Sequence, residues 1–145
     1  MKFGYKKLYI NGALQDAKDE KTFDVICPGN ESVIAKIAWA NKEDTLFALE
    51  TAQTGFKYWS QLPLEERLNW IKRLRSKIIE HRDLLRESIM YEMGKVWEGT
   101  DEDLTSIINS LEYYPQEIQK IHDISIEDRE GTHTHKVIHQ PLGVV

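Results

Sequence analysis

Residues 32–49 have the sequence SVIAKIAWANKEDTLFAL, and the pattern of the chain changes within this stretch. Residues 32–39 are mostly apolar, as in a short strand, whereas the apolar residues after Asn41 recur at helical spacing. Asn41 is a favoured helix N-cap, and Glu43 and Asp44 follow it near the positive end of the helix dipole. The sequence therefore predicts that β-structure ends, and a helical region begins, at Asn41.

The residues before this change predict short strands. Asn11-Gly12 separates two apolar runs within residues 6–15 and tolerates the positive φ angles of a two-residue hairpin turn. Phe23, Val25 and Cys27 alternate along the chain with Asp24 and Ile26, as on the two faces of a strand. Pro28-Gly29-Asn30 predicts a turn before the strand at 32–39. The first 40 residues are therefore predicted to be β-structure in short pieces.

Apolar stripes at helical spacing predict about four helices after Asn41. The second helix is expected to open at Pro63, a residue favoured in the first turn. The third is expected to end at Gly94, a plausible left-handed C-cap. The fourth is expected to begin at Thr100, because an N-cap residue followed by acids marks a helix start. Pro115 is expected to kink or end this helix.

The last part of the chain returns to a β pattern. Residues 123–127 alternate around Ile124 and Ile126, and Glu130-Gly131 predicts a turn before a strand within 133–145. The predicted fold class is therefore α+β, with short β-hairpins, about four helices and a C-terminal β segment.

Composition limits the possible functions. The chain has 145 residues, 41% of them hydrophobic, and a formal net charge of −5. This charge argues against a nucleic-acid partner, since phosphates require a basic face. No apolar run is long enough to predict a membrane span, and the N-terminus has no apolar signal region. The single cysteine, Cys27, suits a reducing compartment, so we expect a cytoplasmic protein.

Two groups of residues are candidates for chemistry. His133, His135 and His139 are all odd-numbered, so an extended strand would place them on one face, where histidine pairs bind zinc in some proteins. The alternative is a solvated face of an edge strand. Cys27 would need a depressed pKa and a nearby base to act as a nucleophile, and its place before Pro28 favours a structural cysteine instead.

No motif in these residues states a chemistry by itself. The sequence contains no glycine-rich phosphate loop, no nucleophile elbow and no paired-cysteine metal motif. The acidic residues gather at predicted helix starts, where the helix dipole explains them without catalysis.

Several stretches, taken in order, resemble the N-terminal part of the NAD(P)-dependent aldehyde dehydrogenase superfamily. They are the hairpin Tyr9-Ile10-Asn11-Gly12, the segment 23–35 around Cys27-Pro28-Gly29, the helix start 41–44, the pattern of Phe56, Trp59 and Arg67, the loop 91–95 with its E-M-G-K sequence, the segment 111–114, and 139–145 with its P-L-G-V-V sequence. Cys27 stands where the family usually has asparagine, and Val96 where proline is common.

This resemblance implies an N-terminal fragment of an α/β aldehyde dehydrogenase-like fold. Residues 1–122 would form the N-terminal part of the cofactor-binding domain, and residues 123–145 would begin the β segment used in oligomerisation. In the family, the catalytic cysteine, the general-base glutamate and the nucleotide-binding sheet lie further along the chain. We therefore expect no catalytic and no cofactor-binding residue here.

The resemblance also implies the chemistry of an intact parent. It would oxidise a small aldehyde to a carboxylic acid through a cysteine thioester, with NAD or NADP as the hydride acceptor. The present chain is expected to be inactive, to bind no cofactor, and to form a homo-oligomer, with the strand within 133–145 offering an open edge.

One site could carry over from the family. Some members hold a structural monovalent cation, and the matching positions here are Val25, Ile26 and Glu92. Carbonyl oxygens and a carboxylate suit a hard cation. Glu92 is one methylene longer than the usual aspartate.

Two alternatives to the fragment interpretation remain open at the level of sequence. One is a folded, non-catalytic module for interaction or oligomerisation. The other is a small zinc protein that uses the C-terminal histidines.

Overall fold

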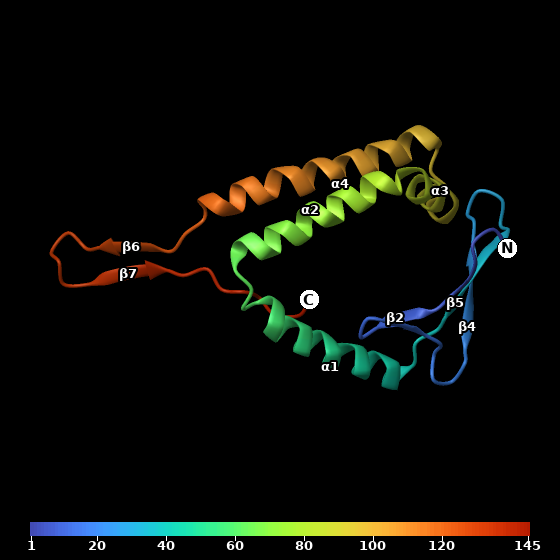
Figure 1. The fold of residues 1–145 in the computed structure, drawn as a ribbon, viewed down its shortest axis with the longest axis horizontal. Helices are drawn as coiled ribbons and strands as arrows, with labels where there is room; N and C mark the ends of the chain where they lie inside the picture. The colour runs from blue at the N-terminus through green and yellow to red at the C-terminus, as the bar shows by residue number, and fades with distance from the viewer.

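The computed structural model describes residues 1–145 as an α+β chain, which confirms the predicted fold class. Figure 1 shows the N-terminal strands at one end, the helices next to them, and a hairpin projecting at the other end. The strands are β1 Gly4–Lys6, β2 Leu8–Ile10, β3 Ala13–Gln15, β4 Thr22–Ile26, β5 Val33–Ala38, β6 Ile124–Glu127 and β7 Thr134–Val137. The helices are α1 Lys42–Trp59, α2 Leu64–Glu80, α3 Arg82–Met93 and α4 Trp97–Glu117, followed by the 3₁₀ turn η1 Ile118–Lys120.

The N-terminal strands form two small sheets. β5 lies at the centre of a three-stranded sheet, parallel to β1 and antiparallel to β4. β2 and β3 form a separate antiparallel hairpin, whose turn has φ 52° at Asn11 and 77° at Gly12. These positive angles confirm the predicted Asn-Gly turn.

The start of α1 also confirms its prediction. The Asn41 side chain accepts hydrogen bonds from the backbone N–H groups of Glu43 and Asp44, at 2.9 and 3.0 Å. Asp44 in turn accepts from the Asn41 N–H at 3.0 Å, which completes a capping box. The Asp44 side chain is fully buried and also accepts from the Lys18 N–H, so it joins the loop before β4 to the helix start.

Helices α2 and α4 lie side by side and run in opposite directions, with the shorter α3 at one end (Figure 1). Leu104 and Ile108 of α4, which packs against both α2 and α3, are buried. Arg75 of α2 crosses it, because its Nε donates to the Ile108 carbonyl at 3.3 Å and its guanidinium lies 2.6 Å from a Glu112 carboxylate oxygen.

The predicted start of α4 was wrong. The helix begins at Trp97 rather than Thr100, with Val96 as an extended N-cap residue. Thr100 is fully buried and its hydroxyl donates to the Trp97 carbonyl at 2.7 Å, so it bonds back along the helix instead of capping it. Pro115 does not end the helix, which continues to Glu117.

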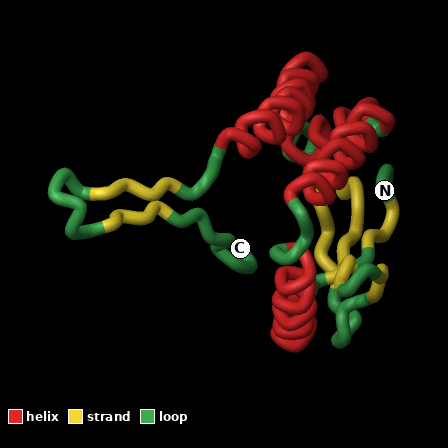
Figure 2. Tube along the Cα trace, turned by 60° about the vertical axis from the view of Figure 1, so that its left-hand side comes forward, coloured by secondary structure: helices red, strands yellow, loops and turns green.

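The C-terminal strands form a separate hairpin. β6 pairs with β7 in antiparallel register, with Ile124 opposite Val137 and Ile126 opposite His135. Figure 2 shows this hairpin standing apart from the helices and the N-terminal sheet, and every residue of its two strands is exposed. β7 is shorter than the predicted strand, so His133 and His139 lie outside it.

The molecule exposes much more surface than its mass requires. Its accessible surface is 11360 Å², and only 10 of its 145 residues are buried. A compact monomer of 17.0 kDa would expose about 7,700 Å². The excess of about 3,600 Å² accompanies many exposed large hydrophobic side chains, which lie on the helices and on the strands alike. No helix is both long and apolar enough to span a bilayer.

Candidate functional site

The turn after β4 meets the end of α3, and this corner contains most of the positions that the sequence singled out. Gly94 caps α3 in the left-handed region, with φ 67°. A β-carbon at Gly94 would lie 2.9 Å from Cγ of Pro28. Because Gly94 has no side chain, the ring of Pro28 packs directly against the end of α3.

The three positions predicted to hold a monovalent cation lie on the two elements that meet at this corner. Val25 and Ile26 end β4, and the pairing of β4 with β5 shifts register between these two residues. Such an irregularity frees backbone groups from the ladder, and carbonyl oxygens are ligands that hard cations accept. Glu92 is exposed in the last turn of α3. The cation site stays a prediction, with its carbonyl and carboxylate donors on neighbouring elements.

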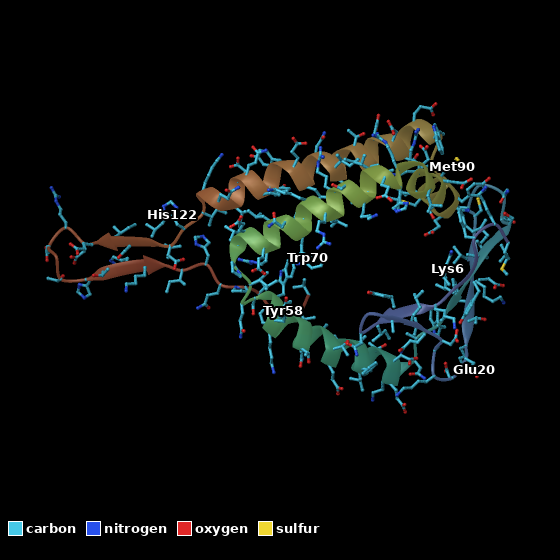
Figure 3. The ribbon with its side chains drawn as sticks, viewed as in Figure 1. Lys6, Glu20, Tyr58, Trp70, Met90 and His122 are labelled. Carbon is cyan, nitrogen blue, oxygen red and sulfur yellow. The ribbon has the colours of Figure 1, made fainter.

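Cys27 lies in the wall of a hollow of about 280 Å³ at the same corner. Its side chain is buried and unpaired, as expected for a structural cysteine. Met90 and Tyr91 of α3 form the opposite wall, and Figure 3 labels Met90 where α3 approaches the sheet. The backbone around Cys27 is fully used in the turn, since its N–H donates to the Ser32 carbonyl at 2.9 Å and its carbonyl accepts from the Glu31 N–H at 2.8 Å.

Ion pairs hold α3 against the start of α4. Asp101 accepts two hydrogen bonds from Arg82, at 2.7 and 3.1 Å, and lies 3.5 Å from Nε of Arg86. The Arg86 guanidinium also stacks over the Trp97 ring, 3.8 Å from its centroid. Lys95 pairs with Asp103 across the turn between the helices. These contacts explain the acids at 101 and 103 as structural partners of basic residues.

The structure does not bring the three C-terminal histidines together as a metal site. His133 lies in the hairpin turn, where its Nδ1 is 2.8 Å from the Thr132 hydroxyl. His139 lies beyond β7, and its backbone N–H donates to Asp123 at 3.0 Å. No group of three histidine, cysteine or acidic side chains is close enough to hold a metal ion. The zinc hypothesis required the three histidines to lie on one face of a strand, and this arrangement is not present.

The hairpin turn is instead organised by a carboxylate. Asp128 accepts from the Thr132 hydroxyl at 2.6 Å and from the Thr132 N–H at 2.7 Å. These hydrogen bonds, chiefly that of the Thr132 hydroxyl, lower the pKa of Asp128 to about 2.

A groove between α2 and α4 was not anticipated from the sequence. It has a volume of about 330 Å³, and seven of its ten lining residues are hydrophobic. Arg67 is the one charged residue in its wall, and the Arg67 Nε is buried without a hydrogen-bond partner. The sequence held two signals: Arg67 lies between Leu64 and Leu68 in the apolar stripe of α2, and Trp59 and Arg67 belong to one of the family patterns.

The chain matches known proteins along nearly its whole length. The model of the aldehyde dehydrogenase family matches residues 14–145. The NADP⁺-dependent D-glyceraldehyde dehydrogenase of Thermoplasma acidophilum is 32% identical over 142 residues, which cover 96% of this chain and 28% of that protein. The mitochondrial benzaldehyde dehydrogenase of Antirrhinum majus is 30% identical over 143 residues, covering 97% of this chain and 27% of that protein.

Solved structures agree with these matches. The betaine aldehyde dehydrogenase of Staphylococcus aureus in complex with NAD⁺ superposes with a TM-score of 0.79 at 28% identity, covering 86% of this chain and 25% of that one. The fold and the sequence together define a piece of an NAD(P)-linked oxidoreductase architecture. The chain belongs to the aldehyde dehydrogenase family, and it spans about a quarter of the length of the relatives that it matches.

The residues present do not fit a dinucleotide. Dinucleotide phosphates bind at the N-terminus of a helix that follows a strand, over a glycine-rich turn. Helix α1 is the one helix here that directly follows a strand. Its first N–H groups already donate to Asn41, and the carboxylates of Glu43 and Asp44 would repel phosphate. The start of α1 therefore offers no site for the phosphates of NAD or NADP.

Proposed function

We propose that this chain serves as the N-terminal part of an NAD(P)-dependent aldehyde dehydrogenase, and that it has no dehydrogenase activity alone. The intact enzyme would oxidise an aldehyde to a carboxylic acid. The supporting observation is the excess of about 3,600 Å² of accessible surface over that of a compact 17.0 kDa monomer. An excess of this size fits a segment whose helices are covered by the rest of a larger fold.

The relatives support the class of reaction and leave the substrate open. Their names specify D-glyceraldehyde, benzaldehyde and betaine aldehyde, which share only the aldehyde group. One of them uses NADP⁺ by name, and another was solved with NAD⁺. The proposal is accordingly limited to an aldehyde as substrate and to either dinucleotide as acceptor.

Within that enzyme, the proposed role of this chain is structural. Residues 1–122 would support the cofactor-binding domain, and residues 123–145 would begin the β segment through which subunits assemble. The exposed strands β6 and β7 suit such a role, since each still has one edge free for pairing.

A chimera tests the proposal. The segment of the Thermoplasma acidophilum enzyme that matches this chain would be replaced by residues 1–145, and NADP⁺ reduction would be followed with D-glyceraldehyde. We expect a folded chimera with measurable turnover, and no turnover by the 145-residue chain alone with either dinucleotide. A chimera that folds and assembles like the parent but lacks activity would refute the proposal, as would turnover by the isolated chain. The second outcome would favour an enzyme of a different kind.

A further inference from the structure

We propose that Asn11, at the tip of the β2–β3 hairpin, is a site of spontaneous covalent modification. Its side-chain amide is lost through attack by the backbone nitrogen of Gly12, and opening of the hairpin sets the rate. The product is aspartate or isoaspartate at position 11. The inference does not depend on the proposed enzymatic role.

The reaction needs only water besides the chain itself. The Gly12 nitrogen attacks Cγ of Asn11, so that a new N–C bond forms. The bond between Cγ and Nδ2 breaks, and ammonia leaves with the proton of the Gly12 nitrogen. Water then opens the resulting five-membered succinimide ring at either of its carbonyl groups. Nothing is oxidised or reduced, and the chain gains one negative charge.

The turn exposes the two groups that react. Asn11 and Gly12 are both exposed, and a β-carbon at Gly12 would meet nothing within 4 Å. The last pair of the hairpin joins Ile10 to Ala13, so the Gly12 N–H lies outside the ladder. Because glycine has no side chain, nothing shields its nitrogen from the neighbouring amide.

The other asparagines are held more firmly. Asn30 accepts hydrogen bonds through Oδ1 from the N–H and the hydroxyl of Ser32, at 3.1 and 2.7 Å. Asn41 accepts from two backbone N–H groups at the start of α1. Asn69 and Asn109 lie inside α2 and α4, where helical hydrogen bonds fix the nitrogen of the next residue. Asparagine is a thermolabile residue, and these contacts leave Asn11 as the preferred position for its loss.

The folded turn itself opposes the reaction. Asn11 has φ 52°, in the left-handed region, where ψ is about +47°. At this ψ the Gly12 nitrogen and Cβ of Asn11 lie on opposite sides of the bond between Cα and the carbonyl carbon. The five-membered ring requires them on the same side, so the turn has to open before the ring can close.

Opening the turn is a local event. β2 and β3 have three residues each and pair only with each other, separately from the three-stranded sheet. A two-stranded hairpin of this kind is marginally stable, and such elements open without unfolding of the rest of a protein. We therefore expect Asn11 to react in the folded chain, but more slowly than in an unfolded one.

The modification should weaken the hairpin permanently. Isoaspartate adds a methylene group to the backbone, so a two-residue turn no longer matches the register of Ile10 with Ala13. Ile10 is buried, and β2 contacts α1 (Figure 1). Loss of the turn therefore also loosens a contact between the hairpin and α1.

The test follows the tag-free 145-residue chain during incubation at neutral pH, with and without concentrated guanidinium chloride. Trypsin releases residues 8–18 as one peptide, and fragment masses locate the exchange of NH₂ for OH within it. We expect Asn11 to react about ten-fold more slowly in the folded chain, which corresponds to an opening free energy of about 1.4 kcal/mol. Asn30 is the control within the same molecule, since it is exposed but hydrogen-bonded.

Two variants test the steps separately. Gly12→Ala should slow the reaction several-fold in guanidinium chloride, where the fold has no influence, because its β-carbon shields the nitrogen. Asn11→Gly keeps a residue that accepts positive φ but has no amide to lose. After equal incubation, the wild-type chain should show a lower midpoint of urea unfolding than before, whereas Asn11→Gly should keep its own midpoint.

Modification of Asn11 before any other asparagine, more slowly in the folded chain than in the denatured one, supports the proposal. An unmodified Asn11 after about one hundred half-times of the denatured chain overturns it, because a marginal hairpin opens more often than that. Earlier reaction at Asn30 overturns the choice of site. Equal rates in the two states overturn the control by hairpin opening, and an unchanged midpoint in the fully modified chain overturns the structural consequence.

Discussion

Replacing Gly94 by alanine tests the contact on which the corner between β4 and α3 depends. The residue has φ 67°, and its new β-carbon would lie 2.9 Å from Cγ of Pro28. The left-handed conformation costs a non-glycine residue about 1–2 kcal/mol, and overpacking at a tight contact costs about 1–3 kcal/mol more. We expect Gly94→Ala to lower the free energy of unfolding by about 3 kcal/mol.

Two other glycines separate the two contributions. Gly12 has φ 77° and open space around its would-be β-carbon, so Gly12→Ala should cost only about 1 kcal/mol for the backbone. Gly55 lies inside α1, with open space and no positive φ. Gly55→Ala should raise the free energy of unfolding by about 0.5–1 kcal/mol, because glycine disfavours a helix interior.

The assay is urea unfolding at constant temperature, followed by far-UV circular dichroism and tryptophan fluorescence. Pro28→Ala removes the ring atom nearest to the new side chain, so it should recover part of the loss caused by Gly94→Ala in a double-mutant cycle. The reasoning fails if Gly94→Ala destabilises the chain no more than Gly12→Ala does. It also fails if Pro28→Ala and Gly94→Ala are simply additive.

Three further predictions concern other parts of the chain. Asn41→Ala should lower the free energy of unfolding by about 1 kcal/mol in the same urea assay, because it removes the side-chain cap of α1; Asn69→Ala, on the exposed surface of α2, should not. The pKa of Asp128 is lowered to about 2 in the fold, so its stabilisation of the hairpin turn should be fully present above the ordinary carboxyl pKa near 3.8 and should disappear as the pH falls towards 2. The NMR signals of the turn's amide groups report this change, and their loss at neutral pH would contradict it. If the predicted cation site forms, KCl should raise the melting temperature more than choline chloride at equal ionic strength, and Glu92→Gln should abolish this difference while Glu98→Gln keeps it; no difference between the two salts would exclude the site.

Local signals in the sequence were sufficient wherever a feature depends on a few neighbouring residues. Asn11-Gly12 specifies its hairpin turn because both residues tolerate positive φ. Asn41 and Asp44 cap each other across three residues. Gly94 ends α3 because a left-handed residue is needed there.

The start of α4 shows where such signals fail. Thr100 followed by acids has the composition of a helix start, yet the helix begins three residues earlier. Asp101 forms an ion pair with Arg82 of α3, and Asp103 forms one with Lys95, just after α3. The sequence does not show which distant basic residue each acid will pair with. Thr100, a buried position inside the helix, therefore resembled an N-cap followed by first-turn acids.

The candidate sites divide in the same way. The family motifs identified Val25, Ile26 and Glu92 as positions, and the fold placed the elements that carry them at one corner. The three histidines would share one face only if a single long strand carried all of them. β7 has four residues, so this condition is not met. Strand length depends on pairing with β6, which no local pattern specifies.

The sequence alone therefore determined the caps at Asn41 and Gly94, the turns, the helical stripes and the family, because these depend on backbone preferences and on the order of residues along the chain. Only the tertiary structure determined that α2 and α4 meet antiparallel, that Arg67 is left with a buried unpaired Nε between them, and that much of the apolar surface remains exposed. The physical reason is that burial depends on which distant segments come into contact, and periodicity shows which face of a helix is apolar without showing what covers it.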